Sequence, residues 1–371
     1  MRRYLFLIIV VCMFFFVLGC SQSMKSDTVS VSQEPAAEEP STNELAMEEP
    51  ASDEPVTLTL YNYGLISDEM FEDYFVKPVS AAYPHITLDR IARSENPIPN
   101  LVVSGVELDI ITGWDSLLDQ FADHGLLADL TPHIKKQNID LDPFSQTHMH
   151  GIELQSATIA PGEIYALPFG YNIYALFYNK DIFDQFGVDY PPDGMTWEDA
   201  IELGIRLTRL EEGVQYKGLD PEGIEKVGNS LSLPYVDAET ERAMLDTDGW
   251  RRVFELVKRI HDIPGNDFEI TNHSGTLNRF IADQNVAMLA APEVLQSMGE
   301  AKFDWDVAEY PSFPESPNIS GVAQTFVVQL SSISKHPDEA MKVMDLVTSE
   351  VVQLPLNQSG LLASVLDDPE I

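Results

Sequence analysis

The amino-acid sequence predicts an α/β fold of two domains that follows an N-terminal export segment. From residue 56 onward, short strand patterns alternate with segments of helical spacing. Several of the strands are continuously apolar, which is typical of parallel strands that helices cover on both faces of a sheet. The roughly 300 residues of this body are enough for about two domains.

The first part of the body alternates strands with helices. Val, Leu and Tyr alternate with Thr and Asn in the first strand, and Asp68 precedes the first helical pattern. A later apolar strand stops at Gly113-Trp114-Asp115. The expected elements are strands at residues 56–63, 86–91 and 108–112, and helices at residues 68–82 and 117–125.

The second part repeats this alternation. Thr196 and Asp199 predict a reciprocal helix cap, because a threonine side chain can accept from first-turn amides while an acid three residues later reaches back. We expect Trp197, Trp250 and Trp305 to lie in the core. The expected elements are strands at residues 164–168, 174–178, 286–289 and 321–330, and helices at residues 180–186, 239–263, 274–282, 293–300 and 338–348, with another after Thr196.

The N-terminus has the pattern of an export signal over residues 1–19. Arg2 and Arg3 precede an apolar run at residues 4–18, which is short for a permanent membrane span. The junction Val17-Leu18-Gly19-Cys20-Ser21 resembles the lipobox of bacterial lipoproteins, which implies an acylated Cys20 carrying chains such as palmitate. An uncleaved signal anchor with a chance cysteine is the alternative. Cys12 would leave with the signal, so no disulfide is expected.

Residues 20–55 predict a disordered acidic linker. They are rich in Ser, Glu, Pro and Ala and contain little to bury. The whole chain carries 60 acidic against 22 basic side chains, a formal net charge of −38. Such a charge argues against nucleic acid and against direct binding to an anionic membrane surface. We therefore expect a body held by its lipid anchor on the outer face of the cell membrane.

Seven short sequence blocks occur in order along the body. They are Leu108-Asp109-Ile110-Ile111 with Gly125-Leu126-Leu127-Ala128-Asp129-Leu130-Thr131-Pro132, Gly162-Glu163-Ile164-Tyr165-Ala166-Leu167-Pro168, Leu176-Phe177-Tyr178-Asn179-Lys180-Asp181 with Phe183, Thr196-Trp197-Glu198-Asp199, Val286-Ala287-Met288, Phe303-Asp304-Trp305-Asp306-Val307, and Ser334 with His336-Pro337-Asp338-Glu339-Ala340. Any one block is weak, but in series they resemble the family 1 extracellular solute-binding proteins, the maltose-binding-protein-like receptors of ABC importers.

This resemblance implies a two-lobed periplasmic-binding-protein-like fold of type II, with a hinge between the lobes. Residues 56–170 and 322–358 would form lobe 1, and residues 171–321 and 359–371 lobe 2. The implied function is capture of a solute by a monomer and its delivery to the permease subunits of an ABC importer. The resemblance implies no enzyme activity and no cofactor.

The chain departs from the family pattern at two places. Asp283-Gln284-Asn285 stands where relatives commonly have Gly before the Val-Ala-Met strand. The sequence also ends at Ile371, before the further helices that relatives usually carry, so we expect lobe 2 to lack C-terminal helices and to be incompletely covered.

Candidate ligand contacts follow from the rule that ligands bind beyond the carboxyl ends of the strands in such sheets. Aromatic side chains can cover the apolar face of a sugar, and carboxylates and amides can bind its hydroxyls. The alternative for each residue is ordinary packing, a helix cap or a solvated polar group. The candidates are Trp114, Asp115, Tyr61 and Asn62 at the strand ends, Tyr171 and Asn172 at the expected crossing, and Glu293 after Pro292.

A neutral mono- or oligosaccharide suits this mixture best, because an anion would meet a strongly negative surface. A polyamine or another cation is the alternative ligand. His148 and His150 could share one face of a strand, but no cysteine or third ligand clusters nearby, so we expect no metal site. Two other functions stay open: a ligand-sensing receptor for a membrane kinase, and a glycoside hydrolase, since 60 acidic residues make paired carboxylates inevitable.

Overall fold

The computed structural model describes residues 54–63, 66–237, 240, 242–267, 269, 272–292, 294–321 and 324–368, which belong to one compact unit, Asp53–Ile371. The predicted signal peptide, Cys20 and nearly all of the predicted linker lie outside the described residues, as does Glu293. The described helices include none that is long and apolar enough to cross a membrane.

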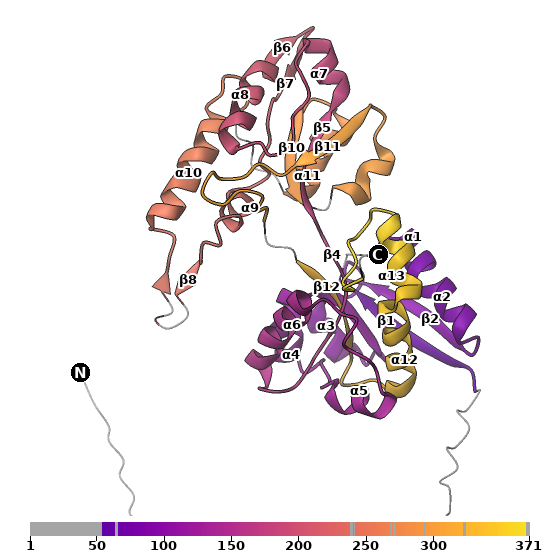
Figure 1. Ribbon diagram of the computed structural model, residues 1–371. Coiled ribbons are helices and arrows are strands. Elements are labelled where there is room, and N and C mark those ends of the chain that lie inside the picture. Colours follow the sequence, from indigo (N-terminus) through magenta and orange to yellow (C-terminus); the bar gives the residue numbers. More distant parts are fainter. Residues whose placement is uncertain are drawn as a thin grey trace, which may run out of the picture. The chain divides into compact units, whose positions relative to one another are not determined.

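The first lobe is built on a five-stranded sheet in the order β2-β1-β3-β12-β4 (Figure 1). The prediction of parallel strands is confirmed for β2, β1 and β3, but β12 runs antiparallel to both β3 and β4. The sheet is therefore mixed, because β12 returns from the second lobe in the opposite direction. The strands are β1 (Val56–Asn62), β2 (Ile86–Ala92), β3 (Ile110–Trp114), β4 (Leu167–Tyr171) and β12 (Thr325–Leu330).

Helices pack on this sheet through a core in which Leu58, Phe75, Phe169 and Met344 are almost fully buried. The helical segments are α1 (Asp68–Phe71), η1 (Glu72–Val76), α2 (Lys77–Ala82), α3 (Ile98–Ser104), η2 (Asp115–Leu117), α4 (Leu118–Asp123), α5 (Thr131–Gln137), α6 (Gln146–Ile159), α12 (Pro337–Thr348) and α13 (Glu350–Gln358).

The second lobe is built on the antiparallel sheet β10-β5-β11. The segment at residues 217–220 lies parallel to residues 286–289, which lead into β10, through the bridges Lys217↔Val286 and Asp220↔Leu289. The elements are β5 (Tyr174–Asn179), α7 (Lys180–Phe186), α8 (Trp197–Leu207), β6 (Arg209–Glu211), β7 (Val214–Tyr216), α9 (Ile224–Asn229), β8 (Val236–Asp237), β9 (Arg242–Ala243), α10 (Asp248–His261), α11 (His273–Leu277), η3 (Asn278–Ala282), β10 (Met288–Pro292), η4 (Leu295–Glu300) and β11 (Trp305–Glu309).

Local chemistry explains the boundaries of α8 and α10. The predicted cap of α8 is confirmed: the Asp199 backbone N–H donates to Thr196 Oγ1 at 3.3 Å, and the Thr196 N–H donates to the Asp199 carboxylate at 2.9 Å. The predicted helix at residues 239–263 is wrong in its first part. It begins only at Asp248, after the hairpin of β8 and β9, and Thr247 caps it.

Trp197, Trp250 and Trp305 of the second lobe were predicted to lie in the core, and the first two do. Trp197 and Trp250 are both 1% exposed and belong to the main cluster of this lobe. Trp305 is only partly buried and packs against a smaller cluster around Phe177 and Phe280. Burial of two indoles on one face of the sheet supplies much of the apolar contact that holds α8 and α10 in place.

The chain connects the lobes twice, once between β4 and β5 and once between β11 and β12. The strands at these connections, β4, β5 and β12, are labelled in Figure 1. Asn172 and Gln324 link the two crossing segments: the Asn172 N–H donates to the Gln324 carbonyl at 3.3 Å, and the Gln324 N–H donates to Asn172 Oδ1 at 3.0 Å. This pair of hydrogen bonds fixes the register of the two crossings.

The segment after α13 returns to the first lobe, which corrects the assignment of residues 359–371 to lobe 2 for the part that is described. Ala363 and Tyr171 exchange backbone hydrogen bonds of 2.9 and 3.1 Å. Leu362 packs so closely over Gly170 that a Cβ at this glycine would lie 3.0 Å from the leucine. Burial of Leu362 and Val365, both at 2% exposure or less, therefore attaches this segment to the β4 edge.

Candidate functional site

Five residues lie at the carboxyl ends of β3 and β4 and on α6, around the start of β12; Tyr171 and His148 are on the Thr325 side of the sheet, and Trp114 is on the Phe326 side. We call them the Thr325 cluster; they are Trp114, Asp115, His148, Tyr171 and Thr325. The ladder pairs Phe326 with Trp114 on one side of β12 and Thr325 with Tyr171 on the other. The sequence placed three of these residues among the candidates and missed the other two, His148 and Thr325.

Trp114 provides the apolar surface of the Thr325 cluster. Its indole lies against the buried ring of Phe326, with 3.9 Å between the ring centroids and 48° between the planes. The indole itself is only partly buried, while Phe326 is 2% exposed. The contact with Phe326 holds the indole in a defined orientation, and the exposed part remains available to a ligand.

Asp115 follows Trp114 as the first residue of η2. Its Oδ1 accepts a hydrogen bond of 2.8 Å from the Ser116 N–H. Burial raises the pKa of this carboxyl above its usual value, although the backbone N–H groups of Ser116 and Thr325 act in the opposite direction. A carboxylate that is partly removed from water, and whose lost hydration the backbone N–H groups replace only in part, is a strong acceptor for a ligand hydroxyl.

His148 reaches the Thr325 cluster from α6. Its Nδ1 lies 2.9 Å from Thr325 Oγ1, and its ring lies on that of Tyr171 with 4.4 Å between the centroids. Burial lowers the pKa of the imidazole below its ordinary value of 6.5. The ring is therefore neutral at neutral pH.

The expectation of a strand around His148 and His150 is wrong, because α6 spans Gln146–Ile159. The helix turns His150 outward, where it is exposed and lies 3.8 Å from Glu153. Within the described part of the chain, no group of His, Cys, Asp and Glu side chains could hold a metal ion. The sequence signal for a helix here was the spacing of the apolar Met149 and Ile152, which are three residues apart and both buried on α6.

Tyr61 and Asn62 do not face a ligand surface, which corrects two of the predicted contacts. Tyr61 is fully buried, packs edge-on against Phe121 at 6.3 Å, and its hydroxyl has no partner among the described residues. Burial raises the pKa of Tyr61 to about 12. The Asn62 amide binds the backbone N–H and carbonyl of Ile66 at 3.2 and 2.6 Å, and so shapes the turn after β1.

Asn172 lies beside the Thr325 cluster but has a structural partner. It is 3% exposed, and its amide oxygen accepts from the Gln324 N–H across the two crossings. Pro292, next to the undescribed Glu293, ends β10 in the buried part of the second lobe. Of the sequence candidates, Trp114 and Tyr171 lie opposite the consecutive residues Phe326 and Thr325 of β12, Asp115 follows Trp114, and Asn172 links the two crossings.

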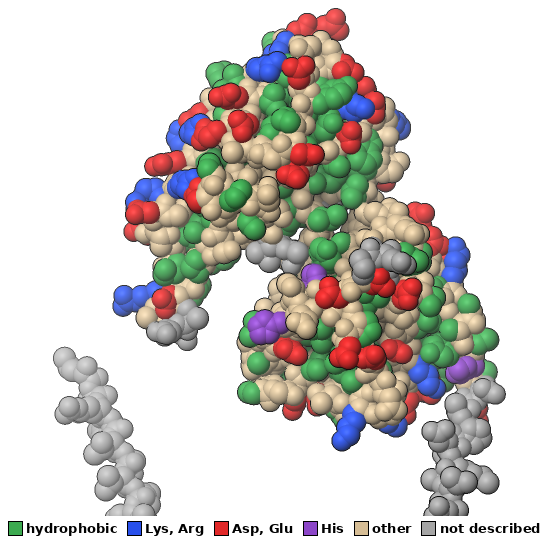
Figure 2. All heavy atoms as spheres, in the orientation of Figure 1, with side chains coloured by type: hydrophobic (Ala, Val, Ile, Leu, Met, Phe, Trp, Pro, Cys, Tyr) green, Lys and Arg blue, Asp and Glu red, His purple; other side chains and the backbone are tan. Residues whose placement is uncertain are grey.

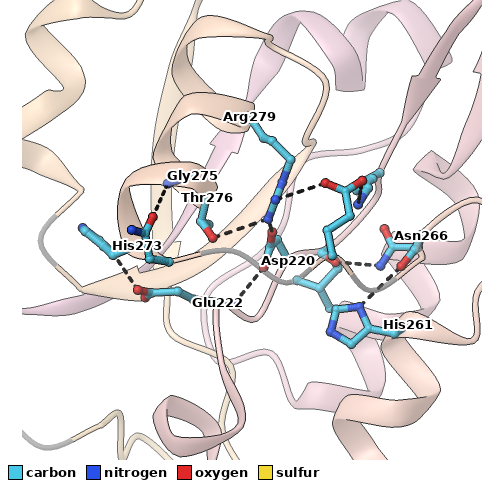
Figure 3. A network of polar contacts seen from close by, with 12 residues as sticks. Asp220, Glu222, His261, Asn266, His273, Gly275, Thr276 and Arg279 are labelled. Carbon is cyan, nitrogen blue, oxygen red and sulfur yellow. Dashed lines mark hydrogen bonds and ion pairs between the residues drawn. The ribbon is translucent and has the colours of Figure 1, made fainter.

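A second polar network lies within the second lobe, between α11, η3 and the segment beside β10 (Figure 3). Figure 3 shows Arg279 pointing toward Asp220 and His273 toward Glu222. Arg279 Nη2 lies 2.6 Å from Asp220 Oδ2, and His273 Nδ1 lies 2.6 Å from Glu222 Oε1. Removing one partner of such a buried pair leaves the other charge uncompensated. We interpret this network as an internal support that attaches α11 and η3 to the sheet.

A hollow of about 630 Å³ lies elsewhere on the first lobe, between residues 138–144, the turn from α12 to α13, and Leu366. Five carboxylates line it, without a lysine or arginine among its lining residues. Its one aromatic lining residue is Phe144, and it contains neither tryptophan nor histidine. Although this hollow is large, the residue types of the Thr325 cluster make the cluster the better candidate for binding a neutral ligand.

Two α/β lobes joined by two crossing segments are the architecture of the two-lobed binding proteins. The family model described as "Bacterial extracellular solute-binding protein" matches residues 102–354. The chain belongs to this family, whose members bind solutes outside the cytoplasm.

Solved structures of ABC transporter binding proteins share this fold. One from Listeria monocytogenes in complex with cycloalternan has a TM-score of 0.70 at 17% identity, over 85% of this chain and 81% of that chain. One from Thermotoga lettingae with bound α-D-tagatose has a TM-score of 0.67 at 17% identity, over 84% and 81% of the two chains. A maltose-bound protein from T. maritima has a TM-score of 0.66 at 16% identity, over 85% and 83%.

Proposed function

We propose that this protein captures a neutral mono- or oligosaccharide at the Thr325 cluster and delivers it to the permease of an ABC importer. The observation that carries the proposal is the half-buried indole of Trp114, which Phe326 orients beside the desolvated carboxylate of Asp115. An aromatic face next to a strong acceptor matches the C–H face and hydroxyl edge of a sugar.

The charge of the protein supports a neutral ligand over an anion. The Thr325 cluster contains no Lys or Arg, and the formal net charge of the chain is −38. An anionic solute would therefore be repelled on approach and would meet no cation at the cluster. The relatives with bound cycloalternan, tagatose and maltose support the same class of ligand.

The test is a thermal-shift screen followed by calorimetry on the chain from residue 21 onward. Its panel contains maltose, mannotriose, α-D-tagatose and cycloalternan, with amino acids and spermidine as controls. We expect one sugar to raise the melting temperature, since a ligand that binds only the folded state stabilises it. A shift with spermidine alone, or with none of the compounds, would contradict the proposal.

The variant Trp114→Ala locates the site. Removing a contacting indole is expected to weaken sugar binding by about 10-fold to 100-fold, which corresponds to the roughly 1.5–3 kcal/mol of a buried large side chain. Trp114→Phe keeps an aromatic face and should retain most of the affinity. Trp305→Ala in the second lobe is the matched control, and an equal loss in both alanine variants would argue against this location.

The membrane attachment is a separate part of the proposal and is supported by the residues around Cys20. The acylated cysteine would hold the body on the outer face of the membrane. Labelling of cells with a palmitate analogue should mark the wild-type protein and not Cys20→Ala. Release of Cys20→Ala into the medium or periplasm would agree with this role, and equal labelling of both would contradict it.

A further inference from the structure

Thr325 and His148 form a hydrogen bond whose direction the surroundings determine. Thr325 is 3% exposed, and its Oγ1 lies 2.9 Å from His148 Nδ1. In the described part of the chain, no other acceptor is found for the Thr325 hydroxyl. If Nδ1 carried the proton, the hydroxyl hydrogen would be buried without an acceptor, which is unfavourable. We therefore assign the Thr325 O–H as the donor and Nδ1 as the acceptor.

This assignment places the proton of the neutral imidazole on Nε2. The ring plane is fixed by its contact with Tyr171, at an interplanar angle of 31°. His148 is only partly buried, and no hydrogen bond of its Nε2 is found among the described residues. His148 thus presents one N–H donor, in a fixed orientation, next to Thr325, whose backbone N–H contacts Asp115.

We propose that His148 is a specificity-determining residue whose Nε2–H donates to a hydroxyl or ring oxygen of the sugar, and that Thr325 is the positioning residue that selects this tautomer. This inference rests on the proposed function. Toward the sugar, Asp115 would accept a hydrogen bond and His148 would donate one. Both residues contact Thr325: Asp115 at its backbone N–H, and His148 at its hydroxyl. An acceptor and a donor placed in this way distinguish a sugar that has a hydroxyl at a given carbon from one that has only a hydrogen there. The sugar without the hydroxyl would leave a desolvated polar group of the protein without a hydrogen bond.

The inference predicts a pH dependence of binding. Protonation at Nδ1 removes the acceptor for the Thr325 hydroxyl, so affinity should fall as the pH drops below the ordinary imidazole value of 6.5, since burial lowers the pKa of His148. The other groups that face the ring are Tyr171 on β4 and, across Thr325, Asp115 on η2. On α6 itself, the exposed His150 and Glu153 pair with each other.

The decisive experiment uses calorimetry on the chain from residue 21 onward, with the sugar of the panel that stabilises the wild type most. His148→Phe keeps the contact with Tyr171 and removes the donor, and should weaken binding about fivefold to tenfold. Thr325→Val should give a smaller loss and Thr325→Ser should restore affinity. His150→Phe, two residues along the same helix, is the matched control and should bind as the wild type does.

Two further readouts separate a binding role from a structural one. In ¹⁵N-resolved spectra of the histidine rings, the signal that His148→Phe removes should show the Nε2–H tautomer and should revert to a mixture in Thr325→Val. The drop in affinity at acidic pH should be smaller in His148→Phe than in the wild type. The pH dependence that the variant retains would come from protonation of Asp115.

The outcomes distinguish this inference from the proposed function. If the wild type binds a sugar and His148→Phe binds it as tightly as His150→Phe does, the inference is overturned and the sugar receptor stands. An Nδ1–H tautomer for His148 would also overturn it. If the wild type binds none of the sugars, the proposed function fails and this inference fails with it.

Discussion

Individual residues of the Thr325 cluster owe their properties to partial burial. Asp115 and His148 titrate in opposite directions from their ordinary pKa values, upward for the carboxyl and downward for the imidazole, because removal from water disfavours the charged form of each. Asp115 and His148 are therefore two hydrogen-bonding groups without a Lys or Arg of the cluster beside them. Such a pair suits a neutral polar ligand.

Tyr61 is a residue whose burial has a measurable cost. Its hydroxyl has no partner among the described residues, so Tyr61→Phe should raise the free energy of unfolding by about 1 kcal/mol near neutral pH. Folding raises the Tyr61 pKa from 10.0 to about 12, so the folded state holds this proton more tightly. The stability that depends on the neutral phenol is complete below pH 10 and is lost as the pH rises toward 12.

Urea unfolding at pH 7 and across the alkaline range measures both effects of Tyr61→Phe. The variant should lose stability less steeply than the wild type above pH 10. Tyr63→Phe is the control, because its ring lies against the same Phe121 at 5.9 Å. Identical alkaline slopes for wild type and Tyr61→Phe would show that this phenol is not the group responsible.

At the scale of elements, the ends of helices and strands decide where the site residues lie. The Thr325 cluster forms because β3, β4 and β12 are neighbours in the sheet and because α6 packs on β4 and η2. Asn172 and Gln324 then join the two crossings next to the cluster. Tyr171 and Thr325 of the cluster are thus the direct chain neighbours of Asn172 and Gln324, which link the two crossings.

The capping box of α8 should account for a defined part of the stability of the second lobe. Thr196→Ala removes the side-chain acceptor for the Asp199 N–H and should lower the free energy of unfolding by about 1 kcal/mol. Thr196→Ser keeps the hydroxyl and should be close to the wild type. Trp197 is adjacent and buried, so tryptophan fluorescence during urea unfolding reports on this lobe. An alanine variant as stable as the serine variant would contradict this role of the cap.

For the whole molecule, negative charge is the dominant long-range feature. Figure 2 shows acidic side chains on both lobes, and the formal net charge is −38. Repulsion between like charges opposes a compact state, and salt screens it over about 10 Å at 0.1 M. The protein should therefore be more stable at higher ionic strength.

Melting curves in 20 mM and 500 mM sodium chloride provide the measurement. We expect the melting temperature to rise with salt, and an uncharged osmolyte that does not screen charge serves as the control. A melting temperature that falls with salt would mean that exposed ion pairs such as Lys136 with Asp338 outweigh the repulsion.

Local periodicity and short motifs were enough to predict the alternation of strands and helices, the cap at Thr196, the buried Trp197 and Trp250, and the family. The sequence also indicated Trp114, Asp115 and Tyr171 through the rule for strand ends. Only the tertiary structure placed β12 antiparallel between β3 and β4, attached Leu362 to the first lobe, buried Tyr61, and brought His148 to Thr325. These features depend on contacts between residues far apart in the chain, such as His148 with Thr325, and a local pattern carries no information about which distant side chain will cover it.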